Sequence, residues 1–310
     1  ELWPNLLREA HRSGATVAIA NARLSDRSFR GYRIARPLMR RVLENVDWIF
    51  AQTERDADRF RQIGARPERV LVTGNLKFDV QPATHGAFAP LLREALAAGP
   101  HRPVLIAAST MPEEEELVLK SWAAIRSKQA SALLILVPRH PPRAGQVTTL
   151  AQAAGCTVVR RTSLGAEPGE IARALAGADV LLLDSVGELA GIFAMADVVF
   201  MGGSLVPTGG HNLLEPAQAG KPVIFGPHMQ NFRDAAAIFV DAGAAIQVQD
   251  WRELAKSALS LLADAGPRQA IGDAARRVVE RESGATERIL SHLAELLGTG
   301  PEVCKAGVQR

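Results

Sequence analysis

The sequence predicts an α/β protein with two doubly wound domains, each a parallel sheet with helices on both faces. Short, unbroken runs of Val, Ile and Leu alternate with helical stretches along most of the chain. Strands buried on both faces of a parallel sheet have this continuous apolar character. The runs form two series, separated by residues 81–86, which contain Pro82 and Gly86. With 310 residues, 47% of them apolar, the chain can bury two cores.

The first series is short. Apolar runs predict strands at 16–20, 47–52 and 69–73, and helices precede or separate them. The polar, Arg-rich segment 21–36 predicts a loop with short helical turns. Three strands are too few for a complete doubly wound domain, so residues 1–85 are predicted to be the second half of one.

The second series is complete. Helical stretches separate most of its strands, and further helices are expected near 250–264, 267–282 and 285–297. These features predict one domain over residues 86–298, followed by a tail at 299–310. The expected strands are 104–108, 133–137, 157–160, 180–183, 198–201, 223–225 and 245–248.

Charge is unevenly distributed. The net charge of the chain is +3, but residues 1–41 hold nine Arg against three acidic residues, which gives this segment +6. Such a block suits an anionic partner, namely a membrane surface, a phosphorylated lipid or a nucleic acid, although a solvated basic face explains it equally well. Two cysteines without metal spacing fit a reducing compartment. No apolar run approaches the 18 residues of a membrane span.

A glycine-rich segment after the strand 198–201 is the strongest candidate site. Two glycine pairs, 202–203 and 209–210, allow tight turns and close approach of a ligand to the backbone. Asn212 is placed to cap a short helix, and Glu215 lies in its first turn. Free N–H groups at such a turn suit a phosphate, and an early Glu suits ribose hydroxyls. The alternative is an ordinary glycine-rich loop with a capping carboxylate.

Other polar residues follow the remaining strands. Arg139 stands between prolines and could bind a phosphate or stack on a base. Residues 184–188 and Lys77 also follow strands, where ligands of doubly wound domains bind. Thr110 and Glu113 instead match a capping box, which accounts for the acidic run 113–116 without a ligand.

Several chemistries are disfavoured. Asp56 and Asp58 resemble the D-x-D motif of metal-dependent glycosyltransferases, but on a helix they point to different faces. No other cluster has metal-ligand spacing, so no metal is expected. The sequence also lacks a G-x-G-x-x-G fingerprint after its first strand and a G-x-S-x-G elbow, which disfavours a dehydrogenase and a serine hydrolase.

Taken together, the motifs resemble those of the 3-deoxy-D-manno-octulosonic acid (Kdo) transferases, over residues 1 to about 290. The resemblance implies a GT-B fold, with two Rossmann-like domains facing a cleft and the N-terminal one incomplete here. It implies an inverting, metal-independent glycosyltransferase without cofactors, which moves Kdo from CMP-Kdo to a lipid A precursor at the cytoplasmic face of the inner membrane. Its partners would be the donor, the acceptor and an anionic membrane surface, not nucleic acid. The motifs, in chain order, are Glu1-Leu-Trp-Pro-Asn5, Asn21-Ala-Arg-Leu-Ser25, Thr73-Gly-Asn-Leu-Lys-Phe-Asp79, Pro138-Arg-His-Pro141, Gly202-Gly-Ser-Leu205, Gly209-Gly-His-Asn-Leu-Leu-Glu-Pro216 and Gly226-Pro-His-Met-Gln-Asn-Phe232.

The resemblance also implies roles for individual residues. Glu1 and Lys77 match residues that support the transition state. The general base of the family lies upstream of the position of Glu1, so residues 1–310 alone are expected to be inactive. The positions that match CMP-binding residues are Pro138, Arg139, Val186, Gly187, Glu188, Asn212, Leu213, Leu214 and Glu215.

Two other functions stay open at this point. One is a different GT-B enzyme that acts on a nucleotide sugar, such as a UDP-dependent transferase or epimerase. The other is a nucleotide-binding remnant without catalysis. The choice of CMP over UDP separates the first from a Kdo transferase, and sugar transfer separates the second.

Overall fold

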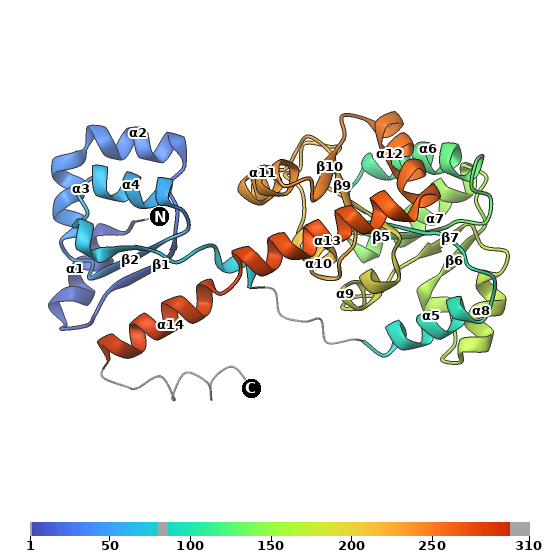
Figure 1. The fold of residues 1–310 in the computed structure, drawn as a ribbon, viewed down its shortest axis with the longest axis horizontal. Coiled ribbons are helices and arrows are strands. Elements are labelled where there is room, and N and C mark those ends of the chain that lie inside the picture. Colours follow the sequence, from blue (N-terminus) through green and yellow to red (C-terminus); the bar gives the residue numbers. More distant parts are fainter. Residues whose placement is uncertain (1, 80–85, 298–310) are drawn as a thin grey trace. The chain divides into compact units, whose positions relative to one another are not determined.

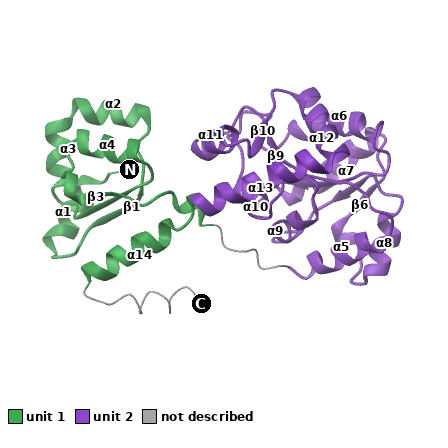
Figure 2. Ribbon diagram, viewed as in Figure 1, with its two compact units in different colours: residues 1–80, 282–310 green, residues 81–281 purple. Residues whose placement is uncertain are grey.

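The computed structural model describes residues 2–79 and 86–297, which form two compact units (Figures 1 and 2). Unit 1 comprises residues 1–80 and 282–310, and unit 2 comprises residues 81–281. This division differs from the expected domains, because residues 282–297 join unit 1. They do so through the carboxylate of Asp79, which accepts hydrogen bonds from the N–H groups of Gly284 and Thr286, each at 2.6 Å. The ring of His292 also packs edge-on against Trp48 and Phe50.

Unit 1 is a three-stranded parallel sheet with helices packed around it. The strands lie in the order β1 (Ala18–Ala22), β2 (Trp48–Ala51) and β3 (Val70–Val72). A core that includes Ile49, Phe60 and Ile63 lies between the sheet and its helices. The helices are α1 (Pro4–Arg12), α2 (Asp26–Ile34), α3 (Arg36–Leu43), α4 (Glu54–Gln62) and α14 (Ala285–Leu296), with 3-10 turns η1 (Pro67–Arg69) and η2 (Leu76–Phe78).

The prediction of a loop with short helical turns over residues 21–36 is wrong. Residues 26–34 form the regular helix α2, which begins after Ser25; the Ser25 hydroxyl accepts a hydrogen bond from the N–H of Ser28. The guanidinium groups of Arg33 and Arg59 lie over the ring of Phe29, which anchors the helix. The high polarity of the segment concealed a helix that packs two half-buried aromatic rings, Phe29 and Tyr32, against the core and has no apolar stripe.

Unit 2 is a seven-stranded parallel sheet in the order β10-β9-β8-β4-β5-β7-β6, and every expected strand is present. Its strands are β4 (Val104–Thr110), β5 (Leu133–Pro138), β6 (Val158–Arg160), β7 (Val180–Leu182), β8 (Val198–Met201), β9 (Val223–Phe225) and β10 (Ala245–Gln247). Its helices are α5 (Phe88–Ala97), α6 (Glu114–Arg126), α7 (Ala144–Ala153), α8 (Pro168–Leu175), α9 (Leu189–Ile192), α10 (Leu214–Gln218), α11 (Arg233–Asp241), α12 (Trp251–Ala263) and α13 (Ala265–Glu282). Four 3-10 turns complete it: η3 (Pro141–Arg143), η4 (Arg161–Ser163), η5 (Phe193–Met195) and η6 (Gln230–Phe232).

The sheet of unit 2 creates a site by its connectivity. The central strands β4, β5 and β8 are buried along nearly their whole length, and α6 packs beside α12 on one face (Figure 1). From β4 the chain proceeds to β5 on one side, whereas β8 pairs with β4 on the other side. This reversal of strand order separates the loops that follow β4 and β8, and ligands bind at such a position in doubly wound sheets.

None of the helices within residues 2–79 and 86–297 has the length and hydropathy needed to span a bilayer.

We expect the exchange Asp79→Asn to destabilise unit 1 by about 2 kcal/mol, because the amide cannot accept both strong hydrogen bonds as the carboxylate does. Burial alone would raise the pKa of Asp79, but the bonds from Thr286 and Gly284 outweigh burial and lower the pKa below its ordinary 3.8. The stabilising contribution is therefore present above pH 4 and lost as the pH falls through the lowered pKa. Thermal melts between pH 2.5 and 7 should show this loss in the wild type alone. Asp58→Asn, on the exposed face of α4, is the control, and an equal effect there would refute the role of Asp79.

Candidate functional site

The residues expected to bind a nucleotide all lie in unit 2, at the carboxyl edge of its sheet. Pro138 is the buried last residue of β5, and Arg139 follows it. Residues 186–188 follow β7, and residues 212–215 follow β8. Because β8, β4, β5 and β7 are successive neighbours, the loops after them meet at one edge. The sheet therefore brings together three segments that are far apart in the sequence.

The glycine-rich loop after β8 is held by a buried carboxylate. Glu114, at the start of α6, is fully buried. Its two oxygens accept hydrogen bonds from the N–H groups of Gly203 (2.6 Å), Ser204 (3.0 Å) and Leu205 (2.9 Å), and also of Met111 (3.1 Å). The anion that this turn binds is thus a side chain of the protein, and these N–H groups are not available to a ligand.

This arrangement corrects the expected capping box. Thr110 is buried, and its hydroxyl has no hydrogen-bond partner among the residues described. Glu113 adopts a left-handed conformation, with φ of 70°, and its side chain does not cap α6. The next residue, Glu114, turns inward instead. Burial raises the pKa of Glu114, and the N–H donors of Gly203, Leu205, Met111 and Ser204 oppose this without cancelling it.

The loop after β9 is locked onto the loop after β8. The hydroxyl of Ser204 accepts from the N–H of Gly226 at 2.8 Å, and the carbonyl of Ser204 accepts from the N–H of His228 at 3.0 Å. A Cβ atom at Gly226 would lie 2.3 Å from the carbonyl oxygen of Ser204, so glycine is required there. Asn231 also donates its N–H to the carbonyl of Gly209. The two loops form one rigid rim along the β8–β9 edge.

The Asn212–Glu215 segment presents a carboxylate in a fixed orientation. The side-chain oxygen of Asn212 accepts from the N–H of Leu214 at 3.1 Å, and its amide nitrogen donates to Glu215 at 2.9 Å. Leu213 and Leu214 are buried, which anchors the turn, while Glu215 is half-buried. Asn212 thus acts one residue before the helical N-cap position, which Leu213 occupies. Gly220, two residues after the end of α10, adopts the left-handed conformation, with φ of 67°.

Positive charge gathers beside this turn. The backbone N–H of Arg139 donates to the carbonyl of Thr110, and the side chains of Arg139 and His140 are exposed. Burial, together with the nearby charges of Arg139 and His140, lowers the pKa of His211, so its imidazole is neutral near pH 7. The Nε2 atom of His211 is buried without a partner among the described residues. Sequence analysis did not select His211 as a site residue; its position between two glycines and Asn212 was the available signal.

Residues 186–188 have an exposed backbone, but the carboxylate of Glu188 is already hydrogen-bonded within the protein. Val186 is 84% exposed, and Gly187 has φ of 83°, so the chain here is open to a ligand. Glu188, however, accepts hydrogen bonds from Arg161, at 3.0 and 3.3 Å from Nε and at 3.1 Å from Nη2, and another from the hydroxyl of Ser185. The guanidinium of Arg161 also lies 3.9 Å above the ring centre of Phe88. The Glu188 side chain therefore holds the loop in place.

The remaining candidates belong to unit 1. Lys77 is exposed on η2, and its N–H donates to the side chain of Asn75. Nearby, Asn21 has φ of 53° at the end of β1, and its side chain accepts from the N–H of Leu76. Glu1 lies outside the described residues. A cavity of about 350 Å³ adjoins Asn21, and its polar lining residues include Arg23, Ser28 and Tyr32.

Comparison with known proteins decides the family. The family model described as 3-deoxy-D-manno-octulosonic-acid transferase (kdotransferase) matches residues 1–80, and that of glycosyl transferases group 1 matches residues 116–278. The 3-deoxy-D-manno-octulosonic acid transferase of Bordetella pertussis is 40% identical over 304 residues, which cover 96% of this chain and 68% of that protein. The chain belongs to the Kdo transferase family. The enzyme of the same name from Haemophilus influenzae is 34% identical, over 96% of this chain and 68% of its own length.

Solved structures agree with this assignment and with the expected GT-B fold. The C-terminal CMP-Kdo binding domain of WaaA from Acinetobacter baumannii is 31% identical, with a TM-score of 0.56, over 63% of this chain and 99% of that one. A putative UDP-N-acetylglucosamine 2-epimerase from Listeria monocytogenes has a TM-score of 0.56 at 18% identity, over 94% of this Kdo transferase and 69% of that chain. This second likeness shows the fold alone.

Proposed function

We propose that this Kdo transferase uses CMP-Kdo as donor and a lipid A precursor as acceptor, in lipopolysaccharide synthesis at the cytoplasmic face of the inner membrane. The observation that carries the donor assignment is the Asn212–Glu215 pair at the carboxyl edge of unit 2. A carboxylate held in this way can accept hydrogen bonds from both hydroxyls of a ribose. The domain of WaaA that 63% of this chain resembles is named for binding CMP-Kdo.

The other expected residues complete a nucleotide site in this proposal. The exposed backbone of Val186 and Gly187 faces the base, the buried Pro138 supports this edge from the end of β5, and the guanidinium of Arg139 pairs with the phosphate. The N–H groups of residues 203–205 take no part, because Glu114 uses them. The neutral imidazole of His211 adds no charge beside the phosphate.

The proposed reaction is a direct displacement with inversion. The acceptor hydroxyl forms a bond to the anomeric carbon of Kdo, while the bond from that carbon to the phosphate oxygen breaks. The bonding electrons leave with CMP, and the hydroxyl proton passes to a general base. By the resemblance, Glu1 and Lys77 match residues that support the transition state of this reaction.

The exchange Glu215→Ala should weaken CMP binding by about 1.5–3 kcal/mol, or roughly 10- to 150-fold in Kd, because a charge-assisted interaction with the ribose is lost. Isothermal calorimetry with CMP measures this directly. Glu215→Gln keeps one acceptor oxygen, so its Kd for CMP should lie between those of the wild type and of Glu215→Ala. Glu170→Ala, on the exposed face of α8, is the control. An unchanged Kd for Glu215→Ala would refute the ribose contact.

The same titration separates the proposal from its nearest alternative. A Kdo transferase should bind CMP at least tenfold more tightly than UDP, whereas a UDP-dependent transferase or epimerase should show the reverse preference. Transfer of Kdo to a lipid A precursor then distinguishes an enzyme from a nucleotide-binding remnant. Binding of both nucleotides with equal affinity would contradict the donor assignment.

Unit 1 carries the proposed contact with the membrane and with the acceptor phosphates. Helix α3 contacts both α1 and α2, and together the three expose several arginines and apolar side chains. Trp3 is 63% exposed and Ile34 is 86% exposed. This combination suits a surface of anionic lipid, where cations meet headgroups and apolar side chains enter the interface. The exposed residues are Arg27, Arg30, Arg33, Arg36, Arg40, Arg41, Trp3, Leu6, Ile34 and Leu38.

Binding to vesicles that contain a phosphorylated lipid should therefore fall steeply with salt. Each arginine near an anionic surface contributes about 1 kcal/mol at low ionic strength, and screening removes most of this by 0.5 M salt. Co-sedimentation at 0.05, 0.15 and 0.5 M NaCl measures the effect. The double variant Arg33→Gln/Arg36→Gln should bind several-fold less at low salt, and neutral vesicles serve as the control. Binding that does not depend on salt would refute an electrostatic contact.

A further inference from the structure

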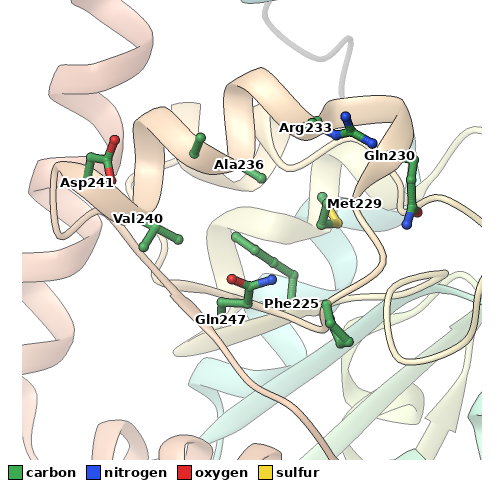
Figure 3. Close-up of a pocket in the computed structure, with 10 residues that line it drawn as sticks. Phe225, Met229, Gln230, Arg233, Ala236, Val240, Asp241 and Gln247 are labelled. Atoms are coloured by element: carbon green, nitrogen blue, oxygen red, sulfur yellow. The ribbon is translucent and has the colours of Figure 1, made fainter. Parts of the chain in front are cut away.

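A second cavity of unit 2 lies at the carboxyl ends of β9 and β10, beneath α11 (Figure 3). Its volume is about 360 Å³, which is sufficient for a sugar ring with substituents. The side chains of Phe225 and Met229 form an apolar part of its wall and are nearly fully buried. The CMP-binding residues discussed above do not line it.

Three long polar side chains surround this cavity without using their hydrogen-bonding groups. The side chains of Gln230, Arg233 and Gln247 make no hydrogen bond or ion pair with any residue in 2–79 or 86–297. Figure 3 shows Gln230 and Arg233 together at one end, with Asp241 at the opposite end. A guanidinium and amides over an apolar wall suit a hydroxylated acid, since Arg binds carboxylates with two parallel hydrogen bonds. The charge of Asp241 favours binding of the acid group at the Arg233 end.

The cavity lies next in line after the nucleotide site along the sheet. The proposed contacts with the base lie at the ends of β5 and β7, and the proposed contact with the phosphate, Arg139, follows β5. The charge of Arg139 acts on His211, which is next to Gly210, so the phosphate contact lies near the 209–210 turn. The contact with ribose follows β8, and the cavity follows β9 and β10. The loops of the last two sites touch: a Cβ atom at Gly210 would lie 2.3 Å from the sulfur of Met229. When the ribose of the donor is bound at Glu215, the attached Kdo can therefore extend over the 209–210 turn toward Met229.

We infer that this cavity binds the sugar-acid part of the donor, with the carboxylate of the sugar on Arg233 and its hydroxyls on Gln230 and Gln247. This inference rests on the proposed function. Kdo is an octulosonic acid, so it carries both a carboxylate and several hydroxyls, and a cavity that binds both distinguishes it from neutral hexoses. Arg233 is thereby a specificity-determining residue that does not touch the nucleotide.

The test compares two ligands on the full chain. Arg233→Gln removes the charge at similar length, and calorimetry measures its Kd for CMP and for CMP-Kdo. We expect the Kd for CMP-Kdo to rise about tenfold or more, while the Kd for CMP changes less than twofold. Arg233→Lys keeps the charge but cannot form two parallel hydrogen bonds, so its Kd for CMP-Kdo should lie between those of the wild type and of Arg233→Gln. Arg277→Gln, an exposed arginine of α13, is the matched control and should leave both constants unchanged.

The outcomes separate the inference from the function on which it rests. If Arg233→Gln binds both ligands as the wild type does, the cavity is not the sugar site, and the nucleotide assignment stands. If the variant loses CMP and CMP-Kdo equally, with an unchanged melting temperature, Arg233 serves the nucleotide and the inference is overturned. If the wild type binds neither CMP nor CMP-Kdo, the proposed function and the inference both fail.

Discussion

Replacement of Glu114 by alanine is expected to lower the free energy of unfolding by about 3–5 kcal/mol. The change leaves four backbone N–H groups without their acceptor, three of them in the loop after β8, around a carboxylate that is fully buried. Because this loop leads into the Asn212–Glu215 turn, the affinity for CMP should fall as well. Urea titration measures the first effect and calorimetry the second.

Two further variants of α6 make this prediction specific. Glu116 lies in the same first turn but is exposed, so Glu116→Ala should change stability by less than about 0.5 kcal/mol. Glu114→Gln retains one acceptor oxygen but places an NH₂ group against N–H donors. Its loss in the free energy of unfolding should therefore lie between those of Glu114→Ala and Glu116→Ala. If Glu114→Ala were as stable as Glu116→Ala, the buried carboxylate would not hold the loop.

The exchange Gly226→Ala is expected to cost about 2–3 kcal/mol, because the added methyl group overlaps rigid backbone. Its nearest neighbours would be the carbonyl oxygen of Ser204 at 2.3 Å and the carbonyl carbon at 2.5 Å, and a main chain cannot rotate aside as a side chain can. The loops after β8 and β9 must separate, which breaks the hydrogen bond between Gly226 and Ser204. We expect a lower melting temperature and weaker CMP binding.

A glycine in open space provides the control for this substitution. Gly169 lies in α8, and a Cβ atom there would meet nothing within 4 Å. Gly169→Ala should therefore stabilise the protein by a few tenths of a kcal/mol to about 1 kcal/mol, since alanine favours the helix. Equal melting temperatures for the two alanine variants would contradict the steric argument at Gly226.

The sheet of unit 2 could be predicted almost residue by residue. Its strands are continuous apolar runs, because both faces are covered, and this signal is local in the sequence. Helix α2 was missed because its residues are mostly polar, as in a loop, and the half-buried ring of Phe29 is held by arginines. The capping box failed for a related reason: four successive glutamates, 113–116, span the start of α6, and only the packed structure distinguishes the buried Glu114 from the exposed Glu116.

Contacts between distant segments explain the rest of what sequence reasoning missed at the site. Glu114 binds a loop about ninety residues away along the chain, and Glu188 is paired with Arg161, 27 residues earlier. Neither pairing has a local signal, since any acidic residue near a helix start satisfies the same pattern. The cavity at Arg233 depends on the meeting of β9, β10 and α11, which the sequence alone does not place together.

The two-segment composition of unit 1 bears on how the protein folds as it leaves the ribosome. Residues 81–281 emerge as one uninterrupted stretch and can close their core early, since domains fold as units during translation. The three strands of unit 1 emerge first, but the ring of His292, which packs against Trp48 and Phe50, emerges only after unit 2. Nascent chains halted before α14 should therefore expose an aromatic surface that chaperones bind.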